Sequence, residues 1–307
     1  MVYEMNIDLV AFGPVVLADL ILVDELPLIN TGIQVKNINK YLSDDAVIVA
    51  TLLSQWKMNT GLICTEIPDD DQGQKILNWL HELNIIGEFR ISPNAEKPYE
   101  VTISDSFGNR TYFWRRDYDF LKSLDSANID IIADSKFLYV DWYDDYHISR
   151  PIEFAISRDV PVFLNLEYGH QYQSILDKYA KYSTIVQSVT DSQQHNPSAA
   201  LNVANKILNA GPKIVIVTMA ENGCLVAAGN QYVRVHPPTN LKVVDVNGAG
   251  ATFSAAFLFG FLNDWKLDEI ARFAVAAASL KCTEIGVVAF PINEIKELSK
   301  FLDVEFW

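Results

Sequence analysis

The sequence predicts a doubly wound α/β fold: one domain over residues 1–307, with a mostly parallel sheet flanked by helices and a second, small β-sheet. Two observations lead to this class. Short β-branched runs alternate along the chain with segments whose apolar residues have helical spacing. The β-branched runs are continuous, which is typical of parallel strands covered on both faces. Half of the residues are hydrophobic, enough for a sizeable core.

The predicted elements follow one another in order. Strands are predicted at Ile7–Phe12, Gly61–Ile67, Phe137–Val140, Val160–Leu166, Thr184–Val186 and Lys213–Thr218. Helices are predicted at Ala46–Trp56, Ile76–Leu83, Tyr172–Tyr182 and Ala199–Asn209. Because crossovers between parallel strands are right-handed, this alternation places helices on both faces of the sheet.

Two stretches break this rhythm and predict the small sheet. Leu20–Lys40 and Lys97–Trp114 alternate apolar and polar residues like exposed antiparallel strands. Within the second stretch, Phe107-Gly108-Asn109 is a turn signal between two strand-like runs, as in a hairpin. We expect this small sheet to be formed by inserts at about 19–41 and 97–115 and to project from the main body.

Composition limits the partners and the compartment. With 24 Lys and Arg against 39 Asp and Glu, the net charge is −15, so nucleic acid and anionic membranes would repel the chain. The three cysteines are far apart, which indicates free thiols in a reducing compartment. The N-terminus lacks a basic segment, and the longest apolar run is too short to span a bilayer. We therefore expect a soluble cytoplasmic protein.

The segment Val243–Phe261 carries the strongest functional signal. A strand is predicted to end near Asp245, followed by the small-residue turn Asn247–Gly250 and an apolar helix. The first turn of a helix presents backbone N–H groups without intrahelical partners, at the positive end of the helix dipole. Glycines let a phosphate approach such a backbone closely. The segment predicts an anion-binding turn, although glycines at this spacing also fit a tight packing turn.

Asp245–Phe253 resembles the second signature of the PfkB/ribokinase-like carbohydrate kinases, Asp-Thr-x-Gly-Ala-Gly-Asp-x-Phe. Further segments resemble the family in the same order over nearly the whole chain: Gly13 with Asp19 and Leu26-Pro27, Asp69-Asp70 with Gly73, Lys213–Cys224, and the segment from Phe273 to Pro291. The resemblance implies a ribokinase-like fold with a β-lid over the substrate. It also implies ATP-dependent phosphotransfer to a sugar or nucleoside hydroxyl, with Mg²⁺ and a monovalent-cation loop.

The resemblance implies roles for individual positions. Backbone N–H groups of Gly248, Ala249 and Gly250 would hold the transferring phosphoryl group, and Asp19 and Asp44 would contact the substrate. Asp245 would lie beside the monovalent-cation loop and point away from the substrate hydroxyl. The nucleotide would contact five positions: Thr218, Ala220, Gly223, Asn247 and Val275.

One departure from the family removes its general base. The Asp that follows Gly-Ala-Gly accepts the substrate proton in the family, and Ala251 stands in its place. A methyl group accepts no proton, and general-base catalysis typically contributes about 10²–10⁴-fold. Other departures affect the sugar, metal and nucleotide positions: Ser43–Ile48 lacks the paired glycines and Asn of the first signature, Gln187–Thr190 replaces Asn-x-x-Glu, and Ala220 and Val275 replace a glycine and a polar residue.

Several hypotheses stay open. The chain is a catalytically impaired member that binds a sugar-like or nucleoside-like ligand, an anion or a protein, with a lid that would favour a homodimer. Alternatively, it is a working phosphotransferase with an unrecognised base, or a non-kinase enzyme on this fold. Arg115-Arg116 either grips an anion or forms a solvated pair countered by Asp117 and Asp119. Val140–His147, rich in aromatic and acidic residues, either contacts the ligand or packs as a loop.

Overall fold

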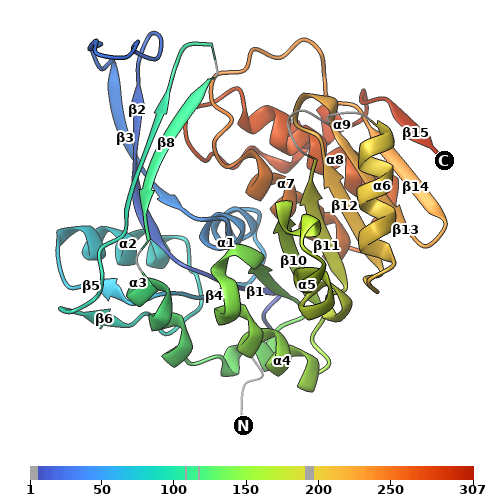
Figure 1. Cartoon of the computed structure of the whole chain (residues 1–307), viewed down its shortest axis with the longest axis horizontal. Helices are drawn as coiled ribbons and strands as arrows, with labels where there is room; N and C mark the ends of the chain where they lie inside the picture. The colour runs from blue at the N-terminus through green and yellow to red at the C-terminus, as the bar shows by residue number, and fades with distance from the viewer. Residues whose placement is uncertain (1–5, 108, 117, 191–196) are drawn as a thin grey trace.

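The computed structural model describes residues 6–107, 109–116, 118–190 and 197–307. Its main sheet has nine strands in the order β15-β14-β13-β12-β11-β10-β9-β1-β4 (Figure 1). The strands are β1 Leu9–Phe12, β4 Thr60–Ile63, β9 Leu138–Asp141, β10 Val162–Glu167, β11 Ile185–Val189, β12 Ile214–Thr218, β13 Cys224–Ala228, β14 Gln231–Val235 and β15 Val304–Phe306. Neighbours from β4 to β12 pair in parallel, and those from β12 to β15 pair antiparallel. The predicted mostly parallel sheet is confirmed.

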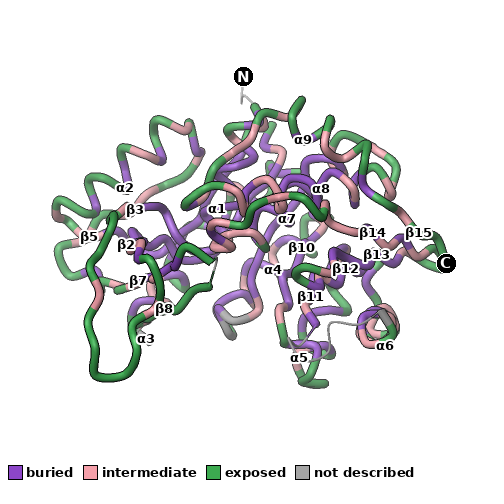
Figure 2. The backbone as a smooth tube through the Cα atoms, turned by 90° about the horizontal axis from the view of Figure 1, so that it is seen from above, coloured by how far each residue is buried: buried purple, intermediate pink, exposed green. Residues whose placement is uncertain are grey.

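Helices cover both faces of this sheet (Figures 1 and 2). Leu9 and Ala11 pack into one core with the first group: α1 Asp45–Gln55, α2 Asp71–Glu82, α7 Ala249–Leu262, α8 Leu267–Lys281 and α9 Ile292–Ser299. Val10 and Phe12 point the other way, into a second core with α4 Ser149–Ser157, α5 Gln173–Lys178 and α6 Pro197–Leu208. Alternate residues of one strand thus serve two cores, which confirms the doubly wound arrangement.

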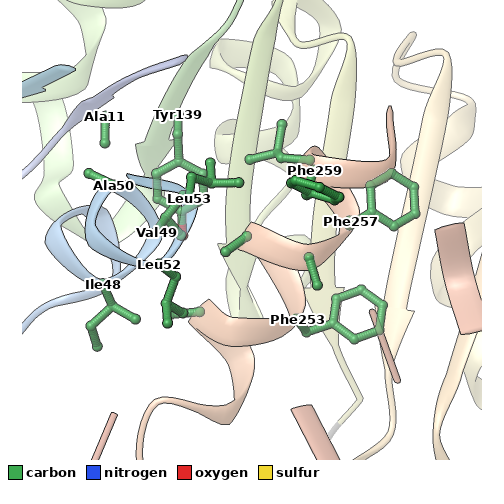
Figure 3. Packing of buried hydrophobic residues seen from close by; sticks show 14 of the residues in the cluster. Ala11, Ile48, Val49, Ala50, Leu52, Leu53, Tyr139, Phe253, Phe257 and Phe259 are labelled. Atoms are coloured by element: carbon green, nitrogen blue, oxygen red, sulfur yellow. The ribbon is translucent and has the colours of Figure 1, made fainter. Parts of the chain in front are cut away.

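Helix α7 is buried almost all round, because it lies between the sheet, α1 and α8. Every residue from Ala251 to Gly260 is buried. Figure 3 shows apolar side chains around both helices: Leu52 of α1 lies towards α7, and Phe253 and Phe257 of α7 project to the side away from α1. Phe259 packs against Trp56 and Phe273, with ring centroids 5.7 Å apart in both pairs. This packing fixes the start of α7, where the predicted anion-binding turn lies.

A separate four-stranded sheet has the order β3-β2-β7-β8 and projects from the body in Figure 1. Its strands are β2 Val16–Leu22, β3 Asn37–Ser43, β7 Tyr99–Ser104 and β8 Arg110–Arg115. β7 and β8 form the predicted antiparallel hairpin, whose Gly108 lies outside the described residues. We call this sheet the lid. Its far end is exposed (Figure 2), and residues 23–36 form a loop rather than continuous strands. A third sheet pairs only β5 Ile67–Pro68 with β6 Ile91–Ser92.

Three predicted elements were wrong in detail. The strand predicted over Gly61–Ile67 ends at Ile63, and Ile67 belongs to β5 in the third sheet. No strand ends near Asp245, because the N–H groups of Val244 and Asp245 donate to Cys282 O, beyond the end of α8, at 2.7 and 3.2 Å. The helix predicted over Tyr172–Tyr182 ends at Lys178 and continues as a short 3₁₀ turn. Among the helices of the described ranges, none combines the length and apolarity that a membrane span requires.

Candidate functional site

Three buried carboxylates lie together at the carboxyl ends of β1 and β9, beneath the lid. Asp141 ends β9, Asp144 follows in the next 3₁₀ turn, and Asp44 immediately precedes α1. One oxygen of each carboxylate lies within 4.8 Å of the others. We call these three residues the acidic cluster. Ligands of open α/β sheets bind at this edge, outside the carboxyl ends of the strands.

The backbone is shaped to bring these carboxylates together. A Cβ atom at Gly13 would lie 2.7 Å from the Cβ of Ala46 and 3.1 Å from Oδ2 of Asp144, so a glycine is needed where β1 ends. Asp44 has a φ of 96°, and Glu167 at the end of β10 has a φ of 43°. Non-glycine residues in such conformations store strain, which is concentrated at functional sites.

The acidic cluster has too few hydrogen-bond donors. Among the described residues, neither oxygen of Asp144 nor Oδ2 of Asp141 has a hydrogen-bond partner. Burial raises the pKa of Asp144 and of Asp141 well above the usual range, and the neighbouring carboxylates raise both further. Burial also raises the pKa of Asp44 to about 7, although Arg116 opposes the shift. The cluster therefore favours protons, cations or hydroxyl donors.

Arg116 is the cation beside the cluster. Its Nη2 lies 2.5 Å from Oδ2 of Asp44 and 3.7 Å from Oε2 of Glu100, and its side chain is only 18% exposed. The contact with Asp44 is an ion pair without an aligned hydrogen bond, since both Asp44 oxygens lack one. Glu100 on β7 also accepts a hydrogen bond from the Ser43 hydroxyl at 2.6 Å. The solvated-pair hypothesis was wrong for Arg116, which ties the lid to the start of α1; Asp117 lies outside the described residues.

Polar side chains at the ends of β10 and β11 continue from the acidic cluster towards α7. The Asn165 amide donates to Asp45 and to Glu167, both at 3.1 Å. Gln187, its neighbour on β11, accepts a hydrogen bond from the Ser254 hydroxyl of α7 at 3.0 Å. The acidic cluster and the start of α7 are thus joined along one edge of the sheet.

The segment that replaces the family's magnesium motif supplies no carboxylate. Gln187 and Thr190 are both buried, and the amide oxygen of Gln187 already accepts from Ser254. Ser188 Oγ donates to the backbone oxygen of Glu167 at 2.6 Å. Asp191 lies outside the described residues. Residues 187–190 therefore do not form the charged magnesium shell of the family.

The turn Asn247–Gly250, which we call the anion turn, leads into α7. Gly248 has a φ of 74°, and a Cβ there would lie 2.8 Å from Val287, so the turn requires glycine. The Ala249 N–H donates to Val246 O at 3.3 Å, which removes one of the three predicted anion-binding groups. Gly250 is exposed, and a Cβ added there would meet no atom within 4 Å. The open space over Gly250 and the free start of α7 fit a phosphate group.

Ala251 is 1% exposed, and the first turn of α7 carries no acidic residue. The carboxylate of Asp245, six residues earlier, is bound by backbone N–H groups of its own surroundings. Its Oδ1 accepts from the Asn247 N–H at 3.0 Å, and its Oδ2 accepts from the Gly286 N–H at 2.9 Å. The fully buried ammonium of Lys281 lies 2.6 Å from the backbone oxygen of Asp245 and 3.4 Å from Oδ2.

These contacts test whether a monovalent cation fits beside Asp245. A cation would need the oxygens that the Lys281 ammonium already contacts, and a second positive charge so close would be repelled. Burial lowers the pKa of Lys281, and the charge of Asp245 opposes that shift. The residues around Asp245 do not fit a resident monovalent ion.

The predicted nucleotide positions lie mainly around the end of β12. Thr218 ends this strand, and Ala220 and Gly223 have φ values of 46° and 79° in the loop that follows. A Cβ at Gly223 would lie 2.0 Å from Val235 O, so the loop needs glycine there. Val275 on α8 is buried in the core, 4% exposed. Contact between these positions and a nucleotide stays a prediction.

Asp19 lies on the opposite side of the lid from the residues that face the body. Its neighbours Ala18 and Leu20 are fully buried in a small core with Val287. Side chains alternate along a strand, so Asp19 points outward, where it pairs with Lys40 at 2.5 Å. This geometry argues against a sugar contact by Asp19, which stays a prediction.

Sequence reasoning missed Arg110 and Lys281. Arg110 on β8 donates to the Asn247 side chain at 3.2 Å, which brings a lid cation to the anion turn. No sequence signal distinguished it from other surface arginines. Lys281 follows Phe273 and Ala277 at intervals of four, and both are buried. That spacing placed a lysine on the buried face of a helix and could have found it.

Comparison with known proteins identifies the family and the fold. Residues 6–294 match the pfkB family carbohydrate kinase. The chain belongs to the PfkB family. An uncharacterized sugar kinase of Archaeoglobus fulgidus is 24% identical over 229 residues, which is 71% of this chain and 89% of the relative.

Solved ribokinase-like structures have the same fold. One is the ribokinase of Arabidopsis thaliana complexed with ribose and ATP: TM-score 0.75, 18% identity, covering 97% of this chain and 100% of that chain. Another is the nucleoside kinase of Burkholderia thailandensis in complex with inosine: TM-score 0.76, 16% identity, covering 95% of this chain and 97% of that chain. The ribokinase-like fold predicted from sequence is thus confirmed for this PfkB-family chain.

Proposed function

We propose that this PfkB-family protein binds a small polyol under the lid and an anion or nucleotide at the anion turn, with little phosphotransfer between them. One observation carries the proposal: Ala251 puts a methyl group at the start of α7, whose first turn carries no acidic residue. A methyl group accepts no proton, whereas the N–H groups of a helix start bind negative oxygens whatever the side chain. Anion binding at the start of α7 is therefore kept, whereas removal of the proton from the substrate hydroxyl is lost.

The polyol is a sugar or nucleoside that is neutral or carries an amine. Carboxylate oxygens that no protein group donates to can accept hydrogen bonds from the hydroxyl or ammonium groups of a ligand. Oδ2 of Asp141 and both oxygens of Asp144 are of this kind among the described residues. Arg116 already pairs with Asp44 and Glu100, and the raised pKa values of Asp141 and Asp144 indicate that burial and neighbouring carboxylates disfavour further negative charge there. A sugar phosphate would be repelled there. The ribose and inosine named for the two solved kinases support a polyol.

The nucleotide is ATP, as in the solved ribokinase complex, with its phosphates over Gly250. Arg110 would add a positive charge from the lid. A magnesium ion would arrive with the nucleotide rather than be held by residues 187–190. We place the protein in the cytoplasm, which its free thiols Cys64, Cys224 and Cys282 support.

A homodimer through the lid, or docking of a protein partner there, belongs to the same proposal. The lid exposes large apolar side chains, including Phe113 at 58% and Ile38 at 59%. Sedimentation velocity tests the dimer: a species of twice the monomer mass is expected, and a monomer at all protein concentrations would exclude it.

ATP consumption tests the proposed impairment. Kinases turn over at about 1–100 per second, and loss of the base lowers this by about 10²–10⁴-fold. With ribose, inosine, fructose 6-phosphate or glucosamine as acceptor, we expect fewer than about 1 turnover per second. Faster turnover would overturn the proposal.

Thermal shifts with the same compounds measure binding separately, because a ligand that binds the native state raises its stability. We expect shifts with neutral and amine-bearing acceptors, not with the sugar phosphate.

A second candidate, an active phosphotransferase with a replacement base, is favoured by Asp44. Its pKa of about 7 is suited to a general base at neutral pH. If the wild type is active, Asp44→Asn should lower kcat by about 10²-fold or more and abolish the fall in rate below pH 7. The matched control is Asp24→Asn, on an exposed aspartate that pairs with Lys36 in the lid. Unchanged kcat in Asp44→Asn would exclude this candidate.

A further inference from the structure

Lys281 ends α8 with its side chain inside the protein. The residue has no exposed surface, although lysines are almost never fully buried without a partner. Its ammonium donates to the backbone oxygen of Asp245 at 2.6 Å and lies 3.4 Å from Oδ2 of the same residue. The backbone oxygen of Glu284, beyond the helix end, lies 3.5 Å away. Three oxygens thus face a group with three donors.

These oxygens belong to a small cage around the Asp245 loop. Two segments meet there: the chain before the anion turn and the loop after α8, held together by Val244 and Asp245 donating to Cys282. Backbone and carboxylate oxygens of this kind are the ligands that hard cations prefer. The resemblance to the family places a monovalent-cation loop at Asp245, and the structure places a lysine ammonium there instead.

We propose that the Lys281 ammonium is a built-in cation, which replaces a bound monovalent ion at the Asp245 loop and makes this protein independent of potassium. A covalently attached cation needs no ion from solution and remains in place at any salt concentration. It also carries the single positive charge that balances the buried carboxylate of Asp245. A second cation in the cage would meet that charge at close range and be repelled.

The built-in cation acts on the anion turn through Asp245, so Lys281 is a positioning residue. One oxygen of Asp245 holds the Asn247 N–H at 3.0 Å, at the first residue of the turn. The other holds Gly286, and the Ser104 hydroxyl of the lid reaches Oδ1 at 3.4 Å. Fixing Asp245 therefore fixes the anion turn, the loop after α8 and the inner edge of the lid relative to one another.

Thermal unfolding in different salts tests the proposal. Wild type is measured in potassium, sodium and choline chloride at equal ionic strength, and we expect the same Tm in all three. Lys281→Ala opens the cage, so its Tm should be lower in choline and rise by at least about 2 °C in potassium or ammonium chloride. A wild type stabilised by potassium over choline, or a variant without selective rescue, would overturn the proposal.

The matched control is Lys206→Ala. Lys206 also donates to a backbone oxygen, that of His170 at 2.6 Å, but not in the Asp245 cage. We expect its Tm to fall without any potassium-selective recovery. Recovery as large as that of Lys281→Ala would show a general salt effect and overturn the proposal.

A measurement on wild type alone covers the case in which Lys281→Ala does not fold. Crystals soaked in thallium(I), a potassium mimic with strong anomalous scattering, should show no anomalous peak among the oxygens of Asp245 and Glu284. A peak there would overturn the proposal. Neither measurement needs a substrate or nucleotide, so the built-in cation and the proposed function can fail independently of each other.

Discussion

The buried aspartate before the anion turn, Asp245, and the buried aspartates of the acidic cluster differ in how many hydrogen-bond donors face their carboxylates. Asp245 has a donor for each oxygen: the N–H groups of Asn247 and Gly286, with the Lys281 ammonium beside them. Asp144 is equally buried, yet neither of its oxygens has a hydrogen-bond partner among the described residues. Two further carboxylates of the acidic cluster surround it.

This difference distinguishes a carboxylate that the fold itself satisfies from one for which we propose a ligand. A buried polar group without a partner costs about 1–3 kcal/mol, so a fold retains such groups where another component supplies the missing donors. Both oxygens of Asp245 accept hydrogen bonds from the chain itself, so this residue connects the anion turn with the loop after α8. The acidic cluster lacks such donors among the described residues, and in our proposal the hydroxyl groups of a polyol supply them.

The largest expected effect comes from removing the cation beside Asp245. Lys281→Met keeps a long apolar side chain but leaves Asp245 buried without its cation, which should lower the free energy of unfolding by about 3–5 kcal/mol in urea denaturation. Lys40→Met is the control, because its pair with Asp19 is partly exposed and should contribute less than about 1 kcal/mol. Similar losses in both variants would contradict the distinction.

The opposite effect, a gain in stability, is expected for a substitution at Asp144 in the acidic cluster. Asp144→Asn keeps the size of the side chain and replaces a carboxyl group whose charged form is disfavoured by burial and by the neighbouring carboxylates, which raise its pKa. We expect the free energy of unfolding at pH 8 to rise by about 1–3 kcal/mol, while the thermal shift caused by the polyol ligand decreases. A less stable variant would show that the chain already satisfies Asp144.

The pH dependence of stability follows from the same cluster. The pKa of Asp44 is about 7 in the folded protein against 3.8 in the reference state. A raised carboxyl pKa gives stability that is complete below the unfolded pKa and lost as pH rises through the folded one. The free energy of unfolding should therefore fall between pH 5 and 8, by at least about 1.4 kcal/mol, the value of one pKa unit. Asp44→Asn should flatten this slope, and an equal slope in the variant would count against the assignment.

The smallest effect on stability is expected at the anion turn. Gly250→Glu places a negative charge in open space at the start of α7, so the free energy of unfolding should change by no more than about 0.5 kcal/mol. The thermal shift with ATP should nevertheless disappear. Gly32→Glu adds the same charge at another open glycine, in the lid loop, and should keep the shift. Loss in both variants would indicate long-range repulsion rather than a local site.

The fold was predictable because short sequence patterns indicate its strands and helices. Continuous β-branched runs marked buried strands such as β12, and the glycine turn marked the start of α7. The strand expected at Asp245 failed because backbone pairing with Cys282, a tertiary contact, determines that segment. The acidic cluster was only partly foreseen, since Asp44 and Asp141 lie 97 positions apart and meet only when β1 and β9 pair.

Asp19 shows why a motif match does not place a side chain. A strand alternates its faces at every residue, so a shift of one position moves a side chain to the other face of the sheet. Ala18 faces the body and Asp19 faces away, although both lie in the segment that resembles the family. Registers of this kind depend on pairing with β3 and β7, which the sequence does not specify locally.

The absent proton acceptor at Ala251 is tested most directly by the turnover of wild type and Ala251→Asp, measured side by side with ATP, magnesium and the acceptor that gives the largest thermal shift. We predict that wild type stays below about 1 per second and that Ala251→Asp is faster by about 10²-fold or more. A wild type faster than that limit, or a folded Ala251→Asp that is no faster than wild type, would contradict the account.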